Sequence, residues 1–394
     1  MDTESRDRMT LGWRGRFGVA TGLATLLLGV AFVSVQAAQT GQADPAERPQ
    51  LSEEVFTNVQ LLKGIPVKEF MGTMGFFSAS LGLNCSDCHV EESGGDWSRY
   101  ADDTELKRTT RRMMAMVSSL NQSMFGGRPM VSCFSCHRGT NRPQVIPDLG
   151  IQYGDAIIVE PDEIVVQGFG VPTPDQIFDS YIQAIGGAER LASVTSFTAT
   201  GMYQGFDDYE KHAVEVYASA PDKRATTVHG TFGDSSWIFD GRNGWLAAPS
   251  VAAPVPVVPL TGGDLEGAKV EAALAFPAQI KQLLVEWRTG DPAMIGDQEV
   301  HVVQGKMAAG GLPIKLYFDP MTGLLVRLVY YNQTPVGRIP TRIDYADYRD
   351  VEGIQMPFTW TITWTDGRSV TEIDSVQVNV PIDARRFAKP GPPA

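Results

Sequence analysis

The chain has 394 residues, of which 43% are hydrophobic and 20% are charged. This length predicts two or three domains, each with an ordinary buried core. The formal net charge of −13 argues against nucleic acid as a partner, because phosphates would repel an acidic surface.

Residues 1–45 are predicted to lie outside the folded part and to direct export. Four arginines precede an apolar run at 17–35, after which Val35-Gln36-Ala37 offers a small-residue cleavage site. The run is long for the core of a signal peptide and only just long enough to span a bilayer. It is therefore either a signal peptide or an N-terminal membrane anchor. Both place the remainder in the periplasm, soluble or tethered to the inner membrane.

Residues 46–148 are predicted to form a mainly helical domain. A short helix should be capped by Ser52, and a second should follow Pro66, which suits a first helical turn. The longest helix is expected at 103–120. Its apolar positions repeat at intervals of three and four, which predicts that Met113 lies on a buried face.

All four cysteines lie in this domain, in two C-x-x-C-H sequences: Cys85-Ser86-Asp87-Cys88-His89 and Cys133-Phe134-Ser135-Cys136-His137. This is the attachment sequence of c-type haem. Each thiol can form a thioether with one haem vinyl group, and the histidine that follows supplies its imidazole to the iron. The sequence therefore predicts two covalently bound haem c groups, with His89 and His137 as proximal ligands.

Two other uses of these cysteines are open. The two pairs could together hold one zinc ion through four thiolates, or each pair could close a disulfide in an exported chain. More than forty residues separate the pairs, which is long for a zinc ribbon, and a histidine after both pairs would then be coincidence. The pattern therefore favours haem.

Each haem iron has a second axial position to fill. His212, His229 and His301 lie far away in the C-terminal half, whereas methionine is abundant near the motifs. A methionine ligand raises the haem potential. A methionine on an apolar helical face is, however, more often a core residue. The candidates are Met71, Met74, Met113, Met114, Met116, Met124 and Met130.

Several stretches between residues 50 and 145 resemble the tetrahaem cytochrome c subunit of photosynthetic reaction centres. They are Asn58-Val59-Gln60-Leu61-Leu62, Glu69-Phe70-Met71-Gly72-Thr73-Met74, the helix with Met113-Met114-Ala115-Met116 and Leu120-Asn121, and Val131-Ser132-Cys133-Phe134-Ser135-Cys136-His137-Arg138-Gly139. The similarity covers one two-haem half of that subunit, so its other two haems are absent. It implies distal ligands at Met74 and Met113, with Met116, one turn further along, as the rival of Met113.

Two arginines are candidates to bind haem propionates. Arg138 directly follows the second proximal histidine, and Arg99 lies in the loop after the first motif. Both could donate charge-assisted hydrogen bonds to a carboxylate, and both could equally be solvated surface residues.

A proline-rich, acidic stretch from Pro143 to Pro172 separates the two halves, and it predicts a linker at 149–172. Residues 173–394 are predicted to form an α+β domain. Thr173 should cap its first helix, because proline follows directly and glutamine stands three residues later. A helical interlude is expected from Leu265 to about Trp287. The rest alternates between strand patterns and turn sequences, which predicts a curved antiparallel sheet. The turns include Asp240-Gly241-Arg242-Asn243-Gly244 and Asp319-Pro320-Met321-Thr322-Gly323.

The order of these elements resembles the curved half-barrel of outer-membrane lipoprotein carriers. Asp347-Tyr348-Arg349-Asp350, leading into Gly353-Ile354-Gln355-Met356-Pro357, carries part of this similarity. In those relatives the concave face takes up an acyl chain, so the resemblance implies a lipid or quinone as a candidate ligand. The alternative is that the apolar face simply packs on the helices.

The leading hypothesis is an exported di-haem c-type cytochrome, not an enzyme, that carries single electrons between periplasmic or membrane partners. A photosynthetic or respiratory complex would be such a partner. One alternative is a di-haem peroxidase, in which one iron stays five-coordinate and Glu91, Glu92 or Asp96 acts as acid or base. Another is a lipid- or quinone-binding protein with a haem module.

Overall fold

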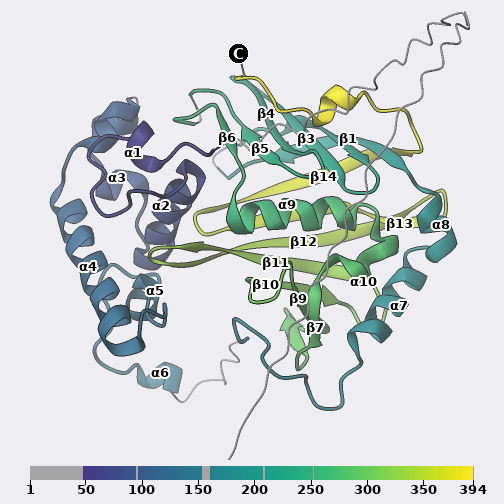
Figure 1. The fold of residues 1–394 in the computed structure, drawn as a ribbon, viewed down its shortest axis with the longest axis horizontal. Coiled ribbons are helices and arrows are strands. Elements are labelled where there is room, and N and C mark those ends of the chain that lie inside the picture. The colour runs from purple at the N-terminus through teal and green to yellow at the C-terminus, as the bar shows by residue number, and fades with distance from the viewer. Residues whose placement is uncertain (1–47, 95, 153–159, 207–208, 252, 394) are drawn as a thin grey trace, which may run out of the picture. The chain divides into compact units, whose positions relative to one another are not determined.

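The computed structural model describes residues 48–393, apart from 95, 153–159, 207–208 and 252. The predicted signal peptide or anchor lies outside the described residues. In the part that is described, no helix is long and apolar enough to cross a membrane. A helical region comes first and an antiparallel sheet follows (Figure 1), which confirms the predicted fold class.

The N-terminal helical region, residues 48–148, is built from short helices around two longer ones. Its elements are α1 (Ser52–Val55), α2 (Val67–Leu81), α3 (Cys85–Cys88), η1 (Glu91–Gly94), η2 (Trp97–Ala101), α4 (Glu105–Phe125) and α5 (Cys133–His137). Helices α2 and α4 each end at a glycine in the left-handed conformation, Gly82 and Gly126.

The prediction for Ser52 was wrong in detail. Leu51 is the cap residue of α1, and Ser52 is its first helical residue. The Ser52 side chain is fully buried, and its hydroxyl donates to the backbone oxygen of Leu62 at 2.6 Å. The hydroxyl therefore fixes the loop that leads to α2.

The rest of the described chain forms one open sheet and further helices. The helices are α6 (Leu149–Gln152), α7 (Pro174–Ala184), α8 (Ala188–Ser193), α9 (Gly262–Leu274), η3 (Pro277–Gln279), α10 (Ile280–Leu283) and η4 (Ala384–Phe387). The strands are β1 (Ser196–Gln204), β2 (His212–Ser219), β3 (Lys223–Gly230), β4 (Gly233–Phe239), β5 (Gly244–Ala247), β6 (Val257–Pro259), β7 (Val285–Thr289), β8 (Ala293–Ile295), β9 (Gln298–Lys306), β10 (Pro313–Phe318), β11 (Leu325–Thr334), β12 (Gly337–Val351), β13 (Ile354–Trp364) and β14 (Gly367–Val378).

The strand order is β6-β5-β4-β3-β2-β1-β14-β13-β12-β11-β10-β9-β7, and β8 pairs with β9. The first and last strands, β1 and β14, are neighbours at the centre of the sheet. Consecutive strands pair antiparallel on either side of them, so the sheet grows outward through hairpins. The two predicted turn sequences join β4 to β5 and β10 to β11, as expected.

Of two helix predictions in this region, one is confirmed and the other is wrong about where the helix ends. The capping box of α7 is present, because the Gln176 backbone N–H donates to the Thr173 hydroxyl at 3.3 Å and Thr173 N–H donates to the Gln176 side chain at 2.9 Å. The helical interlude ends earlier than predicted, at Leu283. Trp287 lies in β7, because the 285–289 segment pairs with the end of β9.

The main core lies between helices α7 to α10 and one face of the sheet. In β10, Ile314, Leu316 and Phe318 point into this core, where Phe318 packs against Phe178 of α7 with ring centroids 5.9 Å apart. Alternate residues of a strand point to opposite faces, so Lys315 and Tyr317 face the other side.

A segment that we call the connecting segment, residues 160–172, lies along that other face. Ile164 is buried there with Tyr317, and the Gln304 side chain bonds both to Ile164 N–H (2.7 Å) and to Ile164 C=O (3.2 Å). The Lys315 ammonium donates to Glu160 at 2.7 Å. These contacts attach the predicted linker to the sheet along part of its length.

His229 gives the sheet a pH-dependent contribution to stability. Its Nδ1 lies 3.0 Å from Asp234 and its Nε2 lies 3.4 Å from Glu215, which also faces Arg386 at 3.7 Å. The hydrogen bond with Asp234 is the main reason that the pKa of His229 is raised. A raised folded-state pKa stabilises the fold below the ordinary value of about 6.5, and the contribution is lost as pH rises through the raised pKa.

We therefore expect His229→Gln to lower the urea midpoint at about pH 5.5 but not at about pH 9, where wild-type His229 is also neutral. Equilibrium urea unfolding at both pH values measures this. An equal loss at both pH values would show that the histidine acts through packing and not through its charge.

Candidate functional site

The first C-x-x-C-H sequence is held as one turn of helix, α3. The Asn84 side chain accepts a hydrogen bond from Asp87 N–H at 3.1 Å, and Asp87 accepts one from Asn84 N–H at 2.8 Å. Reciprocal bonds of this kind start a helix efficiently. Cys85 is exposed and Cys88 is half-buried, just before the loop that follows.

His89 is oriented by the backbone of η2. Its Nδ1 lies 3.1 Å from the Tyr100 carbonyl oxygen, and its ring packs against the Tyr100 ring with centroids 4.7 Å apart. Since a carbonyl can only accept, Nδ1 carries the proton and Nε2 presents a lone pair. Burial, and after it the Lys107 cation, lowers the pKa of His89, which favours the neutral ring that a metal requires.

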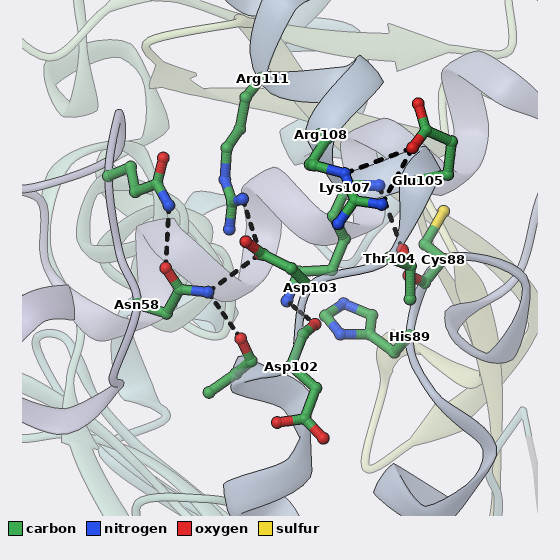
Figure 2. A network of polar contacts seen from close by, with 12 residues as sticks. Asn58, Cys88, His89, Asp102, Asp103, Thr104, Glu105, Lys107, Arg108 and Arg111 are labelled. Carbon is green, nitrogen blue, oxygen red and sulfur yellow. Dashed lines mark hydrogen bonds and ion pairs between the residues drawn. The ribbon is translucent and has the colours of Figure 1, made fainter.

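A polar network holds η2 and the start of α4 around this histidine, as Figure 2 shows. Thr104 donates to the Cys88 carbonyl at 2.6 Å, and Lys107 donates to the Asp102 carbonyl at 2.7 Å. Lys107 also donates to the Tyr100 carbonyl at 2.8 Å. On the far side, Asp103 accepts from Asn58 at 3.0 Å and from Arg111 at 2.7 Å. The first motif is therefore tied to α4 by its backbone.

The second C-x-x-C-H sequence forms the short helix α5. The Ser132 backbone N–H donates to the Ser135 hydroxyl at 3.0 Å at its start. The preceding turn is held by Asn121 of α4, which accepts from Val131 N–H at 3.0 Å and donates to Val131 C=O at 2.8 Å. Cys136 is exposed, whereas Cys133 is buried.

His137 repeats the arrangement of His89. Its Nδ1 lies 3.0 Å from the Thr140 carbonyl oxygen, and the Thr140 hydroxyl donates back to the His137 carbonyl at 2.7 Å. Here too Nδ1 must be the donor, so Nε2 presents the lone pair. Two histidines in equivalent sequence positions thus have the same tautomer for the same reason.

The segments that flank the two motifs are in direct backbone contact. The N–H of Gly139, two residues after His137, donates to the Ser80 carbonyl in α2 at 3.0 Å. Gly82, which ends α2 shortly before the first motif, has a φ of 65°, and a Cβ there would lie 2.3 Å from the Gly139 oxygen. Only glycine fits this crossing. The two sites are therefore neighbours.

The surroundings fit a large, flat apolar group. Of the 21 residues of α4 only Val117 is buried. Met113, Met116 and Leu120 are 36–45% exposed on α4, and Phe134 is 50% exposed within the second motif. A porphyrin needs apolar contact of this kind beside its thiols and imidazole, so the donor set and its environment both fit haem c.

The two predicted distal methionines differ in burial. Met74 is half-buried on α2, two residues before the buried Phe76. At this separation the two side chains point about 160° apart around the helix axis. The prediction that Met113 lies on a buried face was wrong, because α4 is packed by protein mainly at Val117. Its role as a ligand, with Met116 as the rival, stays a prediction.

Among the predicted arginines and acids, Arg99 and Asp96 have contacts within the loop after the first motif. Arg99 pairs with Asp102 at 2.7 Å, and Arg138 is exposed with a φ of 50°. Asp96 accepts a hydrogen bond from Ser98 N–H at 2.8 Å, and its bonds to Ser98 lower its pKa. Propionate binding by the two arginines stays a prediction.

Three positioning groups were not predicted from the sequence: the carbonyls of Tyr100 and Thr140 and the side chain of Asn121. A carbonyl has no signature in a sequence, so only the folded backbone could reveal the first two. Across the described residues, no group of three or more histidine, cysteine, aspartate or glutamate side chains is placed to hold a metal ion.

Residues 7–148 match the family model of the photosynthetic reaction centre cytochrome C subunit. The curated subunit of Thermochromatium tepidum is 35% identical over 130 residues, which cover 31% of this chain and 31% of that protein. The subunit of Roseobacter denitrificans is 28% identical over 110 residues, covering 26% of this chain and 29% of the relative. The predicted resemblance is confirmed for this part, and the chain spans less than a third of these relatives.

Two solved structures have a partial structural similarity to this chain. A putative outer membrane lipoprotein-sorting protein domain from Vibrio parahaemolyticus has a TM-score of 0.38 and 11% identity, covering 54% of this chain and 95% of that chain. A LolA superfamily protein from Nitrosomonas europaea has a TM-score of 0.37 and 13% identity, covering 56% and 99%.

Proposed function

We propose that this chain is a di-haem c-type cytochrome that carries single electrons between protein partners. One observation carries the proposal. Both C-x-x-C-H histidines donate Nδ1–H to a backbone carbonyl, so in each of them Nε2 is the nitrogen with the lone pair that a metal would take. Metal-ligating histidines are oriented in this way by the partner of their other nitrogen. A zinc site of four thiolates, or two disulfides, would leave this repeated arrangement without a role.

A bound haem c supplies a reversible one-electron couple. The chain's residues would hold it in place: two thioethers for each haem, an oriented proximal imidazole and a distal thioether. The residues in these roles are Cys85, Cys88, His89 and Met74 for the first haem, Cys133, Cys136, His137 and Met113 or Met116 for the second, and Arg99 and Arg138 for propionates.

We also propose that the chain acts outside the inner membrane, either soluble in the periplasm or tethered by its N-terminal segment. Its partners would be redox proteins, including membrane-bound photosynthetic or respiratory complexes. The support is the apolar run at 17–35 and the names of its relatives, which are subunits of reaction centres. The net charge of −13 suits basic partner surfaces.

The alternatives have less support. A peroxidase needs an acid or base at an open iron position, and Asp96 is already engaged by Ser98. A lipid or quinone needs space on the helix-covered face of the sheet, where side chains of α7 to α10 form the core. One cavity on this face, beside Glu271 and Arg224, has a volume of about 110 Å³, smaller than the roughly 300–1,000 Å³ of typical ligand pockets.

The spectrum of the oxidised wild-type protein tests the proposal. Two six-coordinate haems should both show the far-red charge-transfer band of a thioether ligand, be reduced reversibly one electron at a time, and turn over no peroxide. A high-spin haem with rapid peroxide turnover would overturn the carrier function in favour of the enzyme.

The distal ligands can be tested by single substitutions. We expect Met74→Ala to remove the thioether band of one haem and to lower its potential, because thioether ligation favours ferrous iron. Met71→Ala, on the same helix, is the matched control and should leave both haems unchanged. Met113→Ala and Met116→Ala, compared in the same way, should identify the second ligand. If Met74→Ala retained both bands, Met74 would not be a ligand.

A further inference from the structure

The hairpin that joins β11 to β12 is buried on one side of its tip, where Pro335 is exposed and Val336 is covered. Thr334 and Gly337 pair across a two-residue loop, and the Thr334 hydroxyl donates to the Gly337 carbonyl at 2.8 Å. Val336, in the loop itself, is only 5% exposed, and Ile339 is 7% exposed. Hairpin tips normally lie in solvent and carry polar residues. The covered, apolar side of this tip therefore needs a partner surface.

That surface is the second C-x-x-C-H site. Val336 and Ile339 form one buried cluster with Phe76 of α2 and with Cys133, the first cysteine of the second motif. Figure 1 shows the hairpin reaching from the sheet to α2 and α5. The sheet thus contributes side chains to the immediate surroundings of a haem-attachment sulfur.

The backbone fits this contact closely. Gly337 has a φ of 157°, and a Cβ there would lie 2.7 Å from the Phe76 ring and 3.2 Å from the side chain of Ser132, the residue before Cys133. In α2, a Cβ on Gly72 would lie 3.2 Å from Ile339. Two glycines therefore let the hairpin approach the helix and the motif.

The four cysteines differ in burial accordingly. Cys133 is 9% exposed, whereas Cys85 and Cys136 are exposed and Cys88 is half-buried. The cluster around Cys133 takes two of its four buried members from the hairpin. The hairpin is thus a large part of what keeps water from this sulfur.

We propose that the tip of the β11–β12 hairpin is a wall of the second haem site, which fixes Cys133 and raises the reduction potential of the haem attached there. The proposal rests on the proposed function. Ferric haem carries one more positive charge than ferrous haem, and an apolar wall disfavours the more highly charged form. Opening the wall to water should therefore lower the potential of the second haem and leave that of the first unchanged.

The whole chain with Val336→Ser tests this, and Val228→Ser is the matched control. Val228 of β3 is also 5% exposed, and it packs in a cluster that contains no residue of the helical region. Val336→Thr, which keeps the shape and adds a hydroxyl, serves where Val336→Ser does not fold. Potentials are measured by spectroelectrochemical titration, with each haem assigned from chains that lack one cysteine pair.

A second readout uses the chain produced without haem. Alkylation followed by mass spectrometry should show that Cys133 reacts more slowly than Cys136 in the wild type. Val336→Ser should speed Cys133 alkylation by about tenfold or more, because the cluster then opens locally at lower cost. Val228→Ser should leave the ratio of the two rates unchanged.

If a Val336 variant carried both haems with unchanged potentials, the hairpin would not be a wall of the second haem site. The proposed function would be unaffected. The same shift in Val228→Ser would also overturn the wall, because a general loosening of the fold would then be the cause. A chain that attaches no haem would instead contradict the proposed function, while the alkylation readout would still decide whether the hairpin covers Cys133.

Discussion

Replacing Cys133 and Cys136 together by serine is expected to leave a chain with one covalently bound haem instead of two. A thioether needs sulfur, and the hydroxyl of serine does not replace it. The reciprocal change, Cys85→Ser with Cys88→Ser, should remove the other haem, and all four changes together should remove both. Haem per chain is measured as pyridine haemochrome after the protein has been denatured.

The control for this experiment is Ser86→Ala, at an exposed position between the first two cysteines. It should leave the haem content at the wild-type value, since Ser86 contributes no sulfur. If either cysteine-pair variant kept the full wild-type haem content, the assignment of that pair to a haem would be wrong.

Loss of the Glu160 carboxylate should cause a large fall in stability. The Lys315 side chain is 2% exposed, and its ammonium donates to Glu160 Oε1 at 2.7 Å. Tyr317 donates to the same oxygen, also at 2.7 Å. Glu160→Ala would leave a buried cation and a buried hydroxyl without this acceptor, which should cost about 3 kcal/mol of unfolding free energy. Equilibrium denaturation with guanidinium chloride measures this.

The matched variant changes the other member of the Lys315–Glu160 ion pair and is Lys315→Met. It removes the charge and leaves Glu160, whose side chain is 36% exposed, in reach of water, so the cost should be below about 1 kcal/mol. The double variant should be about as stable as Lys315→Met alone. Equal costs for the two single variants would mean that the buried charge is not the reason for the loss.

Much of the fold could be predicted where local signals agree with tertiary structure. Thr173 caps α7, as its capping-box sequence predicts, and the predicted turn at 240–244 joins β4 to β5. Strand β9 was not predicted, because residues 302–306 are all buried and show no alternation. One face of β9 meets the helices and the other meets the connecting segment, and a strand covered on both faces loses the period of two.

The candidate site also has some features that the sequence predicts and others that only the folded chain shows. The two C-x-x-C-H sequences and their histidines were found from their spacing alone, because residues that are neighbours in the sequence stay close in space in any fold. The carbonyls that orient His89 and His137 belong to residues later in the chain. The sequence does not show that these residues fold back against the two histidines. The contact of Val336 with Cys133 joins residues about 200 positions apart, which no local pattern can reveal. Met113 was misjudged because the period of a helix does not say what covers its apolar face.

The number of haem groups that stay attached to the purified chain after denaturation tests the central claim most directly. Intact-mass measurement, compared with the mass expected from the sequence, gives that number without any assumption about spectra. The account predicts two haems on every chain. A colourless chain, or one whose cysteines are recovered bound to zinc or joined in disulfides, would contradict it.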